Sequence, residues 1–228
     1  MLHDPLVPLT LPDTWPYPRR QVQLPLACRE GRGLPGLGGG WRVCAPAGDV
    51  DLGPADALPG AYGRGGILRA GDAVLRPYRR GGLLRHVNER TYRTSIRFAS
   101  EYAIHRALWE AGFPTVEPLG YAWRPHRWGV EGVFITRFAE GEPWPRRWDL
   151  SARVRTDLDR ALGALCAWGL WAPDLNATNV LLHADGGLLL LDWDRARFAP
   201  GADLRARYDI RLARSLRKLG APAEAFPA

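Results

Sequence analysis

The chain is poor in cysteine, in lysine and in long apolar runs. Its 228 residues include three scattered cysteines, Cys28, Cys44 and Cys166. This odd-numbered set favours a reducing cytosol and predicts neither a disulfide framework nor a zinc site. The longest apolar candidate, residues 161–173, is shorter than the roughly 20 residues of a membrane-spanning helix. Asp4 and several prolines stand where a signal peptide would have its apolar core, so we expect no secretion signal.

The composition is that of a globular protein, with 46% hydrophobic and 24% charged residues. The length suits one compact domain or two small lobes. The formal net charge of +7 comes almost wholly from arginine, because Lys218 is the only lysine. Guanidinium groups bind phosphate in a bidentate manner, so this charge favours an anionic substrate or an anionic membrane surface. No nucleic-acid motif is recognisable, and no nucleic-acid partner is expected.

A polar segment at residues 174–179 is followed by an apolar run and a second polar segment at residues 191–194. Asp174 precedes Asn179 by five positions, and Asp192 comes after the apolar run. Phosphoryl transfer from ATP uses one carboxylate to orient the attacking hydroxyl, and an amide and a second carboxylate to hold magnesium. Asp and Asn are also common in turns, so the plain alternative is a polar turn between a helix and a β-hairpin. The full spacing favours the kinase-type site.

Residues 60–69 are rich in glycine and precede an apolar stretch at residues 73–78. The pattern predicts a strand, a glycine-rich turn and a strand, with a further turn at residues 70–72. Glycines let a backbone approach phosphates closely, so Gly63, Arg64, Gly65 and Gly66 form a candidate phosphate loop. A plain hairpin turn would have the same composition.

Apolar periodicity predicts a helix at residues 92–112 that ends at Gly112. Its predicted apolar face has Glu101 beside it and consists of Ile96, Ala99, Ala103, Ala107 and Leu108. Strands are predicted at residues 119–123 and 132–138, with shorter ones at 22–24 and 41–43. Residues 34–40 are expected to be a flexible loop, and residues 139–143 a hinge between lobes.

Two further helices are predicted, at residues 151–168 and 203–219. The apolar face of the first comprises Val154, Leu158, Ala161, Leu162 and Leu165, and that of the second Leu204, Tyr208, Leu212, Leu216 and Leu219. The opposite face of the last helix carries an arginine stripe, which consists of Arg205, Arg207, Arg211, Arg214 and Arg217. The stripe is either a solvated face or a surface for anionic lipid or membrane phosphate.

The sequence resembles the 3-deoxy-D-manno-octulosonic acid (Kdo) kinases, a lipopolysaccharide kinase group of the protein-kinase-like superfamily. The matching pieces run in order along the chain: residues 63–66, 75–83, 101, 112–118, 174–182, 191–195 and 211–218. The segments Tyr-Arg-Arg-Gly-Gly at 78–82 and Arg-Ser-Leu-Arg-Lys at 214–218 are characteristic of this family rather than of kinases at large.

The resemblance implies an α+β, protein-kinase-like fold with two lobes. Residues 1–138 would form a small antiparallel sheet with one helix, and residues 139–228 a mainly helical lobe, in one kinase-like domain overall. ATP would be covered by the loop at residues 63–66, and its adenine would meet the backbone near Arg137 to Ala139.

The resemblance also assigns chemistry to the polar segments. Asp174 would be the catalytic base, and Asn179 and Asp192 would coordinate Mg²⁺. Asp194 stands where many kinases have glycine, and would be either a further metal ligand or the residue that orients Arg195. Ala172 replaces the histidine that usually clamps the catalytic loop, which leaves the positioning of Asp174 open.

A second departure from general kinases is the missing lysine that normally pairs with the helix glutamate and touches the ATP phosphates. Alignment on the usual strand pattern puts Arg76 at that position, where it could pair with Glu101. Arg79 and Arg80 are equal alternatives for this role.

The resemblance implies an ATP-dependent kinase that phosphorylates the 4-hydroxyl of Kdo on an anionic glycolipid, a lipid A precursor. The enzyme would work in the cytoplasm, held peripherally at the inner membrane. One alternative is a phosphotransferase with another acceptor: a heptose, a small molecule or a protein. The other is a pseudokinase that binds nucleotide without turnover.

Overall fold

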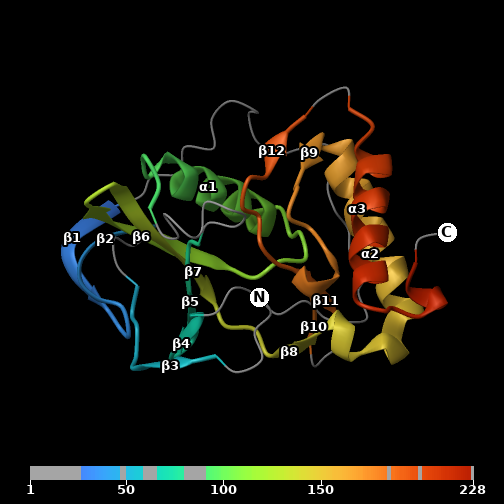
Figure 1. Cartoon of the computed structure of the whole chain (residues 1–228), viewed down its shortest axis with the longest axis horizontal. Coiled ribbons are helices and arrows are strands. Elements are labelled where there is room, and N and C mark those ends of the chain that lie inside the picture. Colours follow the sequence, from blue (N-terminus) through green and yellow to red (C-terminus); the bar gives the residue numbers. More distant parts are fainter. Residues whose placement is uncertain are drawn as a thin grey trace. The chain divides into compact units, whose positions relative to one another are not determined.

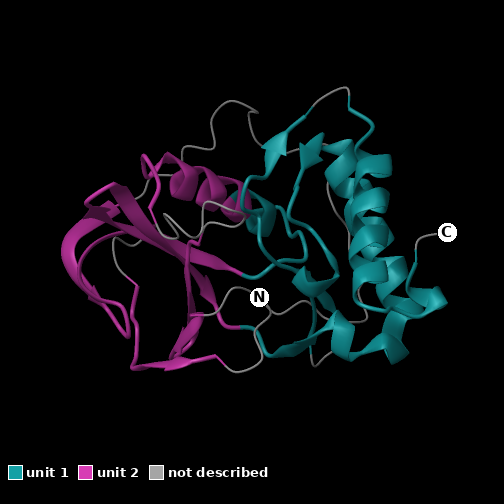
Figure 2. Ribbon diagram, viewed as in Figure 1, with its two compact units in different colours: residues 1–22, 107–116, 139–228 teal, residues 23–106, 117–138 magenta. Residues whose placement is uncertain are grey.

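A computed structural model of the chain describes residues 27–46, 50–58, 66–79, 91–183, 186–199 and 202–226. The chain divides into two compact units (Figure 2). The sheet unit contains the described residues of 23–106 and 117–138. The helix-pair unit contains those of 107–116 and 139–228. The combination of an antiparallel sheet with a few helices confirms the predicted α+β class.

Seven antiparallel strands of the described residues form one curled sheet in the order β1-β2-β6-β7-β5-β4-β3 (Figure 1). The strands are β1 (Ala27–Leu34), β2 (Gly38–Ala45), β3 (Ala55–Ala57), β4 (Leu68–Ala70), β5 (Ala73–Pro77), β6 (Pro118–His126) and β7 (Gly129–Arg137). The predicted strands at 119–123 and 132–138 are confirmed as parts of β6 and β7. The turn predicted at residues 70–72 joins β4 to β5. The strand predicted at 22–24 lies outside the described residues.

The hairpin of β1 and β2 corrects two expectations. Only residues 35–37 form the turn, so most of the predicted loop at 34–40 is strand. Cys28 and Cys44 are opposite each other in the two strands and are joined by a disulfide. The prediction that the chain forms no disulfide is therefore wrong. The two cysteines are 16 positions apart in sequence, and only the register of the paired strands brings them together.

Each face of the sheet carries its own apolar cluster. One face includes Leu75, Val133 and Ile135, all fully buried. The other face packs against helix α1 (Ile96–Glu110) through an aromatic cluster, which includes Tyr78, Tyr92, Phe98, Tyr102, Tyr121 and Phe134. Gly132 in β7 permits this packing, since a Cβ there would lie 2.3 Å from the Phe98 ring.

Helix α1 starts four residues later than the predicted 92–112, and its buried face also differs. Tyr92 pairs with Val130 in a β-bridge instead of starting the helix. Ile96 is 68% exposed, whereas Phe98, Glu101 and Tyr102 are buried. The helix ends at Glu110, two residues before the predicted end at Gly112, whose φ of 75° suits the left-handed conformation that follows a helix C-terminus.

The helix-pair unit is built on two long amphipathic helices that lie side by side (Figure 1). They are α2 (Ser151–Ala167) and α3 (Leu204–Lys218). The predicted apolar face of α2 is confirmed in full, because all five of its residues are buried. On α3, Leu204, Tyr208, Leu212 and Leu216 are buried as predicted. None of the helices in the described parts of the chain is both long and apolar enough to span a membrane.

Short strands and 3-10 turns complete this unit. Strands β8 (Gly141–Pro143), β10 (Val180–His183) and β11 (Leu188–Leu190) form one small sheet, and β9 (Leu170–Trp171) pairs with β12 (Arg197–Phe198). The 3-10 turns are η2 (Trp144–Arg146), η3 (Trp148–Leu150), η4 (Ala177–Asn179) and η5 (Ala223–Ala225). The segment at residues 139–143, which was predicted as a hinge, thus contains strand β8. Asp174 lies in the loop between β9 and η4.

Candidate functional site

Asp174 is held by two arginines of the helix-pair unit. Arg195 donates hydrogen bonds to both carboxylate oxygens of Asp174. Its Nε donates to Oδ2 at 2.9 Å, and its Nη2 donates to Oδ1 at 2.5 Å and to Oδ2 at 2.7 Å. Arg211 adds a longer bond from Nη2 to Oδ1 at 3.4 Å. This bidentate pair was not predicted from sequence, because it joins residues 21 positions apart.

Two asparagines shape the loop around Asp174. The side chains of Asn176 and Asn179 both donate to the carbonyl oxygen of Asp174, at 2.7 and 2.9 Å. Asn176 Oδ1 accepts the N–H of Thr178 at 2.9 Å and so caps η4. The turn propensity noted in the sequence therefore operates here, and it fixes the main chain on which the Asp174 carboxylate is mounted.

Helix α3 clamps the same loop through polar side chains spaced along one face. The Tyr208 hydroxyl accepts the N–H of Ala172 at 3.0 Å and donates to the carbonyl of Leu170 at 2.8 Å. Arg211 Nε donates to the Leu175 carbonyl at 3.0 Å. The third contact is from the N–H of Ala177 to Ser215 Oγ, at 3.2 Å.

Sequence reasoning missed this clamp. The spacing of residues 208, 211 and 215 was the available signal, but Tyr208 was assigned to the apolar face and Arg211 to the arginine stripe. The arginine stripe is only partly solvated: Arg205 bonds Asp159 and Asp209, while Arg211 reaches the loop.

Asp192 follows β11 in a strained but well-anchored segment. Its φ of 68° is unusual for a residue other than glycine, and such conformations cost on the order of 1–3 kcal/mol and cluster at functional sites. The next residue, Trp193, is buried and donates from Nε1 to Thr115 Oγ1 at 2.9 Å. Thr115 in turn donates to the Leu190 carbonyl at 2.7 Å. These bonds hold the chain on both sides of Asp192.

Asn179 connects the Asp174 loop to the Asp192 segment. Its side chain bonds the main chain of Asp174, and its carbonyl accepts the N–H of Leu191 at 2.8 Å. With Nδ2 used in this way, its amide oxygen is the group that can ligate a cation. No cluster of three or more His, Cys, Asp or Glu suited to a metal occurs among the described residues. The donor set fits Mg²⁺, which uses one or two carboxylates and completes its shell with waters and phosphate oxygens.

In the sheet unit, the predicted pair of Arg76 and Glu101 is present. Arg76 Nη2 donates to Glu101 Oε1, and the Tyr78 hydroxyl donates to Oε2. Glu101 is only 3% exposed. A carboxylate at this depth is tolerated because both of its oxygens are hydrogen-bonded.

The candidate phosphate loop is described only at its last residue. Gly63, Arg64, Gly65 and the alternative phosphate ligand Arg80 lie outside the described residues. Gly66 lies against Arg79, since a Cβ there would come within 2.6 Å of Arg79 Nη2. Arg79 therefore remains a competitor of Arg76 for an ATP phosphate.

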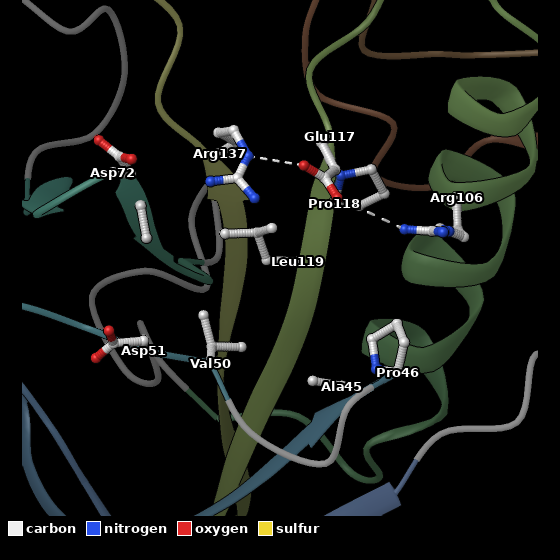
Figure 3. Close-up of a pocket in the computed structure, with 11 residues that line it drawn as sticks. Ala45, Pro46, Val50, Asp51, Asp72, Arg106, Glu117, Pro118, Leu119 and Arg137 are labelled. Carbon is white, nitrogen blue, oxygen red and sulfur yellow. Dashed lines mark hydrogen bonds and ion pairs between the residues drawn. The ribbon is translucent and has the colours of Figure 1, made fainter. Parts of the chain in front are cut away.

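Arg137 lies on the rim of a cavity of about 420 Å³ in the sheet unit (Figure 3). Its Nε donates to Glu117 Oε2 at 2.7 Å. The N–H of Arg137 bonds the Glu117 carbonyl at 2.8 Å, and that of Phe138 bonds the Asp72 carbonyl at 2.6 Å. The main-chain N–H groups of Arg137 and Phe138 are therefore both already hydrogen-bonded within the sheet unit.

The α+β fold, with its curled antiparallel sheet, is compatible with that of a protein-kinase-like phosphotransferase. No protein-family model matches the chain. A protein of Xylella fastidiosa (strain 9a5c) is 33% identical over 168 residues, which cover 65% of this chain and 63% of that protein. Proteins of Xanthomonas campestris pv. campestris (strain B100) and Xanthomonas oryzae pv. oryzae (strain PXO99A) are 32% identical over 181 and 180 residues.

Both Xanthomonas matches cover 69% of this chain and 68% of the relative. All three relatives are named 3-deoxy-D-manno-octulosonic acid kinase. The chain therefore belongs to the 3-deoxy-D-manno-octulosonic acid kinase family, as the sequence motifs predicted. It spans 63% of the length of the Xylella relative.

Proposed function

We propose that the protein is an ATP-dependent kinase that phosphorylates a hydroxyl of Kdo, at the 4-position, on a lipid A precursor in lipopolysaccharide biosynthesis. The observation that carries the proposal is the role of Asn179, which ties the Asp174 loop to the segment that bears Asp192. Two facts support the proposal: phosphoryl transfer from ATP uses two carboxylates and an amide, the groups that these segments carry, and the chain belongs to the Kdo kinase family.

In this proposal Asp174 orients the acceptor hydroxyl and takes its proton. Asn179 and Asp192 would hold Mg²⁺, with Asp194 as a third candidate ligand. The ion would neutralise charge on the phosphates of bound ATP. The clamp by α3 keeps the Asp174 loop in place, which matters because catalysis of this kind relies on positioning and on electrostatic stabilisation.

The sheet unit would contribute ATP contacts. Arg76, fixed by Glu101, is the proposed phosphate ligand, with Arg79 and Arg80 as the alternatives. Residues 63–66 are proposed to cover the phosphates. In the finer proposal the sheet unit corresponds to the small lobe of a kinase and the helix-pair unit to the mainly helical lobe.

The proposed acceptor is an anionic glycolipid, which agrees with the net charge of +7. We also propose peripheral contact with the cytoplasmic face of the inner membrane, through exposed arginines of α3. Arg214 and Arg217 are exposed there, and cations on a helix surface are attracted to anionic lipid headgroups.

The test is incubation of the protein with ATP, Mg²⁺ and a Kdo-bearing lipid A precursor, with mass spectrometry for a product heavier by one phosphate. Asp174→Asn removes the base and should lower turnover by about 10²–10⁴-fold. Asp157→Asn, on the surface of α2, is the matched control and should retain activity. Asp192→Asn should raise the Mg²⁺ concentration needed for half-maximal rate.

Bound ATP without product from any lipid acceptor would contradict this function. Product from a heptose, a small molecule or a protein would identify the alternative phosphotransferase. Nucleotide binding with no transfer to any of these acceptors would indicate a pseudokinase.

A further inference from the structure

The hydrogen bonds from Arg195 to the carboxylate of Asp174 conflict with the proposed role of Asp174 as a base. A general base has to come within about 2.6–3.2 Å of the hydroxyl whose proton it accepts. Both oxygens of Asp174 are instead engaged by the Arg195 guanidinium, at 2.5 to 2.9 Å. With the bond from Arg211, Oδ1 and Oδ2 each accept two hydrogen bonds, so an acceptor hydroxyl needs one of these bonds to be released.

Arg195 is better placed to move than Arg211, the second arginine on this carboxylate. The side chain of Arg195 is 55% exposed, against 38% for Arg211. Arg211 is also bonded to the Leu175 carbonyl from its position on α3. Arg195 projects from a turn, where its own φ is 62°. Departure of Arg195 would leave Asp174 with the contact from Arg211, so the half-buried carboxylate would keep a positive partner.

The chemistry of the acceptor supplies a new partner for Arg195. The relatives are named for a sugar acid, so the acceptor carries a carboxylate of its own. The Arg195 fork already holds a carboxylate in bidentate geometry, and guanidinium matches that group better than an ammonium does. The exchange of one carboxylate for another on the same guanidinium keeps both the charge pairing and the hydrogen bonds.

We propose that Arg195 is the acceptor-binding residue that recognises the sugar carboxylate. Without acceptor it is paired with Asp174, and the acceptor carboxylate replaces Asp174 on the guanidinium and so frees the base. The inference rests on the proposed Kdo kinase function. It makes Arg195 a specificity determinant, because an acceptor without a carboxylate leaves Asp174 blocked.

The test compares two acceptors, the Kdo-bearing lipid A precursor and the same molecule with its Kdo carboxylate converted to the carboxamide. Wild type should prefer the acid by about 10- to 100-fold in kcat/KM, as expected for charge-assisted hydrogen bonds. Arg195→Gln keeps a polar side chain of similar reach but removes the charge, and should reduce this preference to about one. The KM for ATP should not change.

Arg207→Gln is the control for loss of one arginine, since Arg207 is on α3 and its guanidinium lies over the Trp171 ring. It should keep the wild-type preference. Circular dichroism and thermal unfolding check that Arg195→Gln is folded.

The experimental outcomes that would contradict the inference can be told apart from one another. Wild type that phosphorylates neither acceptor overturns the proposed function, and this inference with it. Product formation with the same acid-over-amide preference in Arg195→Gln overturns the inference alone. A raised KM for ATP with that preference intact would assign Arg195 to a nucleotide phosphate and also overturn it.

Discussion

The hydroxyl of Tyr208, on α3, is hydrogen-bonded to the main chain at Ala172, two residues before Asp174. It accepts the N–H of Ala172 at 3.0 Å and donates to the carbonyl of Leu170 at 2.8 Å. One side chain on α3 thereby satisfies two main-chain groups just ahead of Asp174. Since Ala172 and Tyr208 are buried, water cannot take over either bond.

Tyr208→Phe should therefore destabilise the protein and slow phosphoryl transfer. The buried N–H of Ala172 would lose its partner, at a cost of about 1–3 kcal/mol in the free energy of unfolding. Turnover should fall while the KM for ATP stays near wild type, because the change acts on the loop that holds Asp174. Urea unfolding and steady-state kinetics measure the two effects. Tyr121→Phe, in β6, should leave turnover unchanged; an equal loss there would contradict a specific role for Tyr208.

The same variant should change the alkaline pH dependence of stability. Burial raises the pKa of the Tyr208 hydroxyl well above its ordinary value near 10. Because the folded state holds this proton more tightly, the contribution is fully present below about pH 10 and is lost as the pH rises beyond it. Tyr208→Phe should flatten this decline. Burial also raises the pKa of Tyr121 and of Cys166, so part of the decline should remain.

Two glycines offer a matched test of packing. Gly163, within α2, has open space where a Cβ would project, so Gly163→Ala should stabilise the fold by about 0.5–1 kcal/mol through helix propensity. Gly132→Ala would place its Cβ 2.3 Å from the Phe98 ring and should destabilise by about 1–3 kcal/mol. Chemical denaturation measures both. Stabilisation by Gly132→Ala would mean that α1 does not pack on β7 as described.

Sequence patterns predicted best where one physical rule decides the outcome. The apolar stripe of α2, from Val154 to Leu165, was predicted completely because burial of one helix face fixes it. The ion pair of Arg76 with Glu101, one of the alternatives that the strand alignment gave, is present. The face of α1 was predicted only in part: Ala107 and Leu108 are buried, but Ile96 is exposed, and periodicity of apolar residues gives no weight to a buried carboxylate such as Glu101.

The remaining errors involve contacts between residues distant in sequence. The Cys28–Cys44 disulfide depends on the register of a hairpin whose strands are largely glycine and polar residues. The contacts of Tyr208 and Ser215 with the Asp174 loop join residues 36 to 38 positions apart. Periodicity shows which side of α3 is apolar, but not which polar group reaches a particular carbonyl.

Exposed arginines on α3 lead to a prediction about membranes. Arg214→Glu with Arg217→Glu should weaken co-sedimentation with anionic vesicles by tenfold or more, at about 1 kcal/mol for each arginine near the surface. The difference should shrink as salt is added, because screening shortens the range of the attraction. Arg32→Glu with Arg127→Glu makes the same charge change at exposed positions of the sheet unit and should have a smaller effect. Equal weakening by both pairs would indicate net charge rather than a surface on α3.

The choice among Arg76, Arg79 and Arg80 as the ATP-phosphate ligand can be settled by single substitutions. Arg76→Ala should raise the KM for ATP about tenfold or more, whereas Arg79→Ala and Arg80→Ala should leave it near wild type. Arg76→Ala should also lower the free energy of unfolding by about 3–5 kcal/mol, because it removes the guanidinium partner of the buried Glu101 carboxylate.

Adding Glu101→Gln to Arg76→Ala separates these two effects. The neutral amide removes the buried negative charge, so stability should recover in part while the KM for ATP stays high. Recovery of both properties would mean that Arg76 only supports the fold. A raised KM in Arg79→Ala or Arg80→Ala, with Arg76→Ala unaffected, would move the phosphate contact to the segment after β5. An arginine guanidinium would then contact the ATP phosphates from outside the strand position that carries the lysine in ordinary kinases.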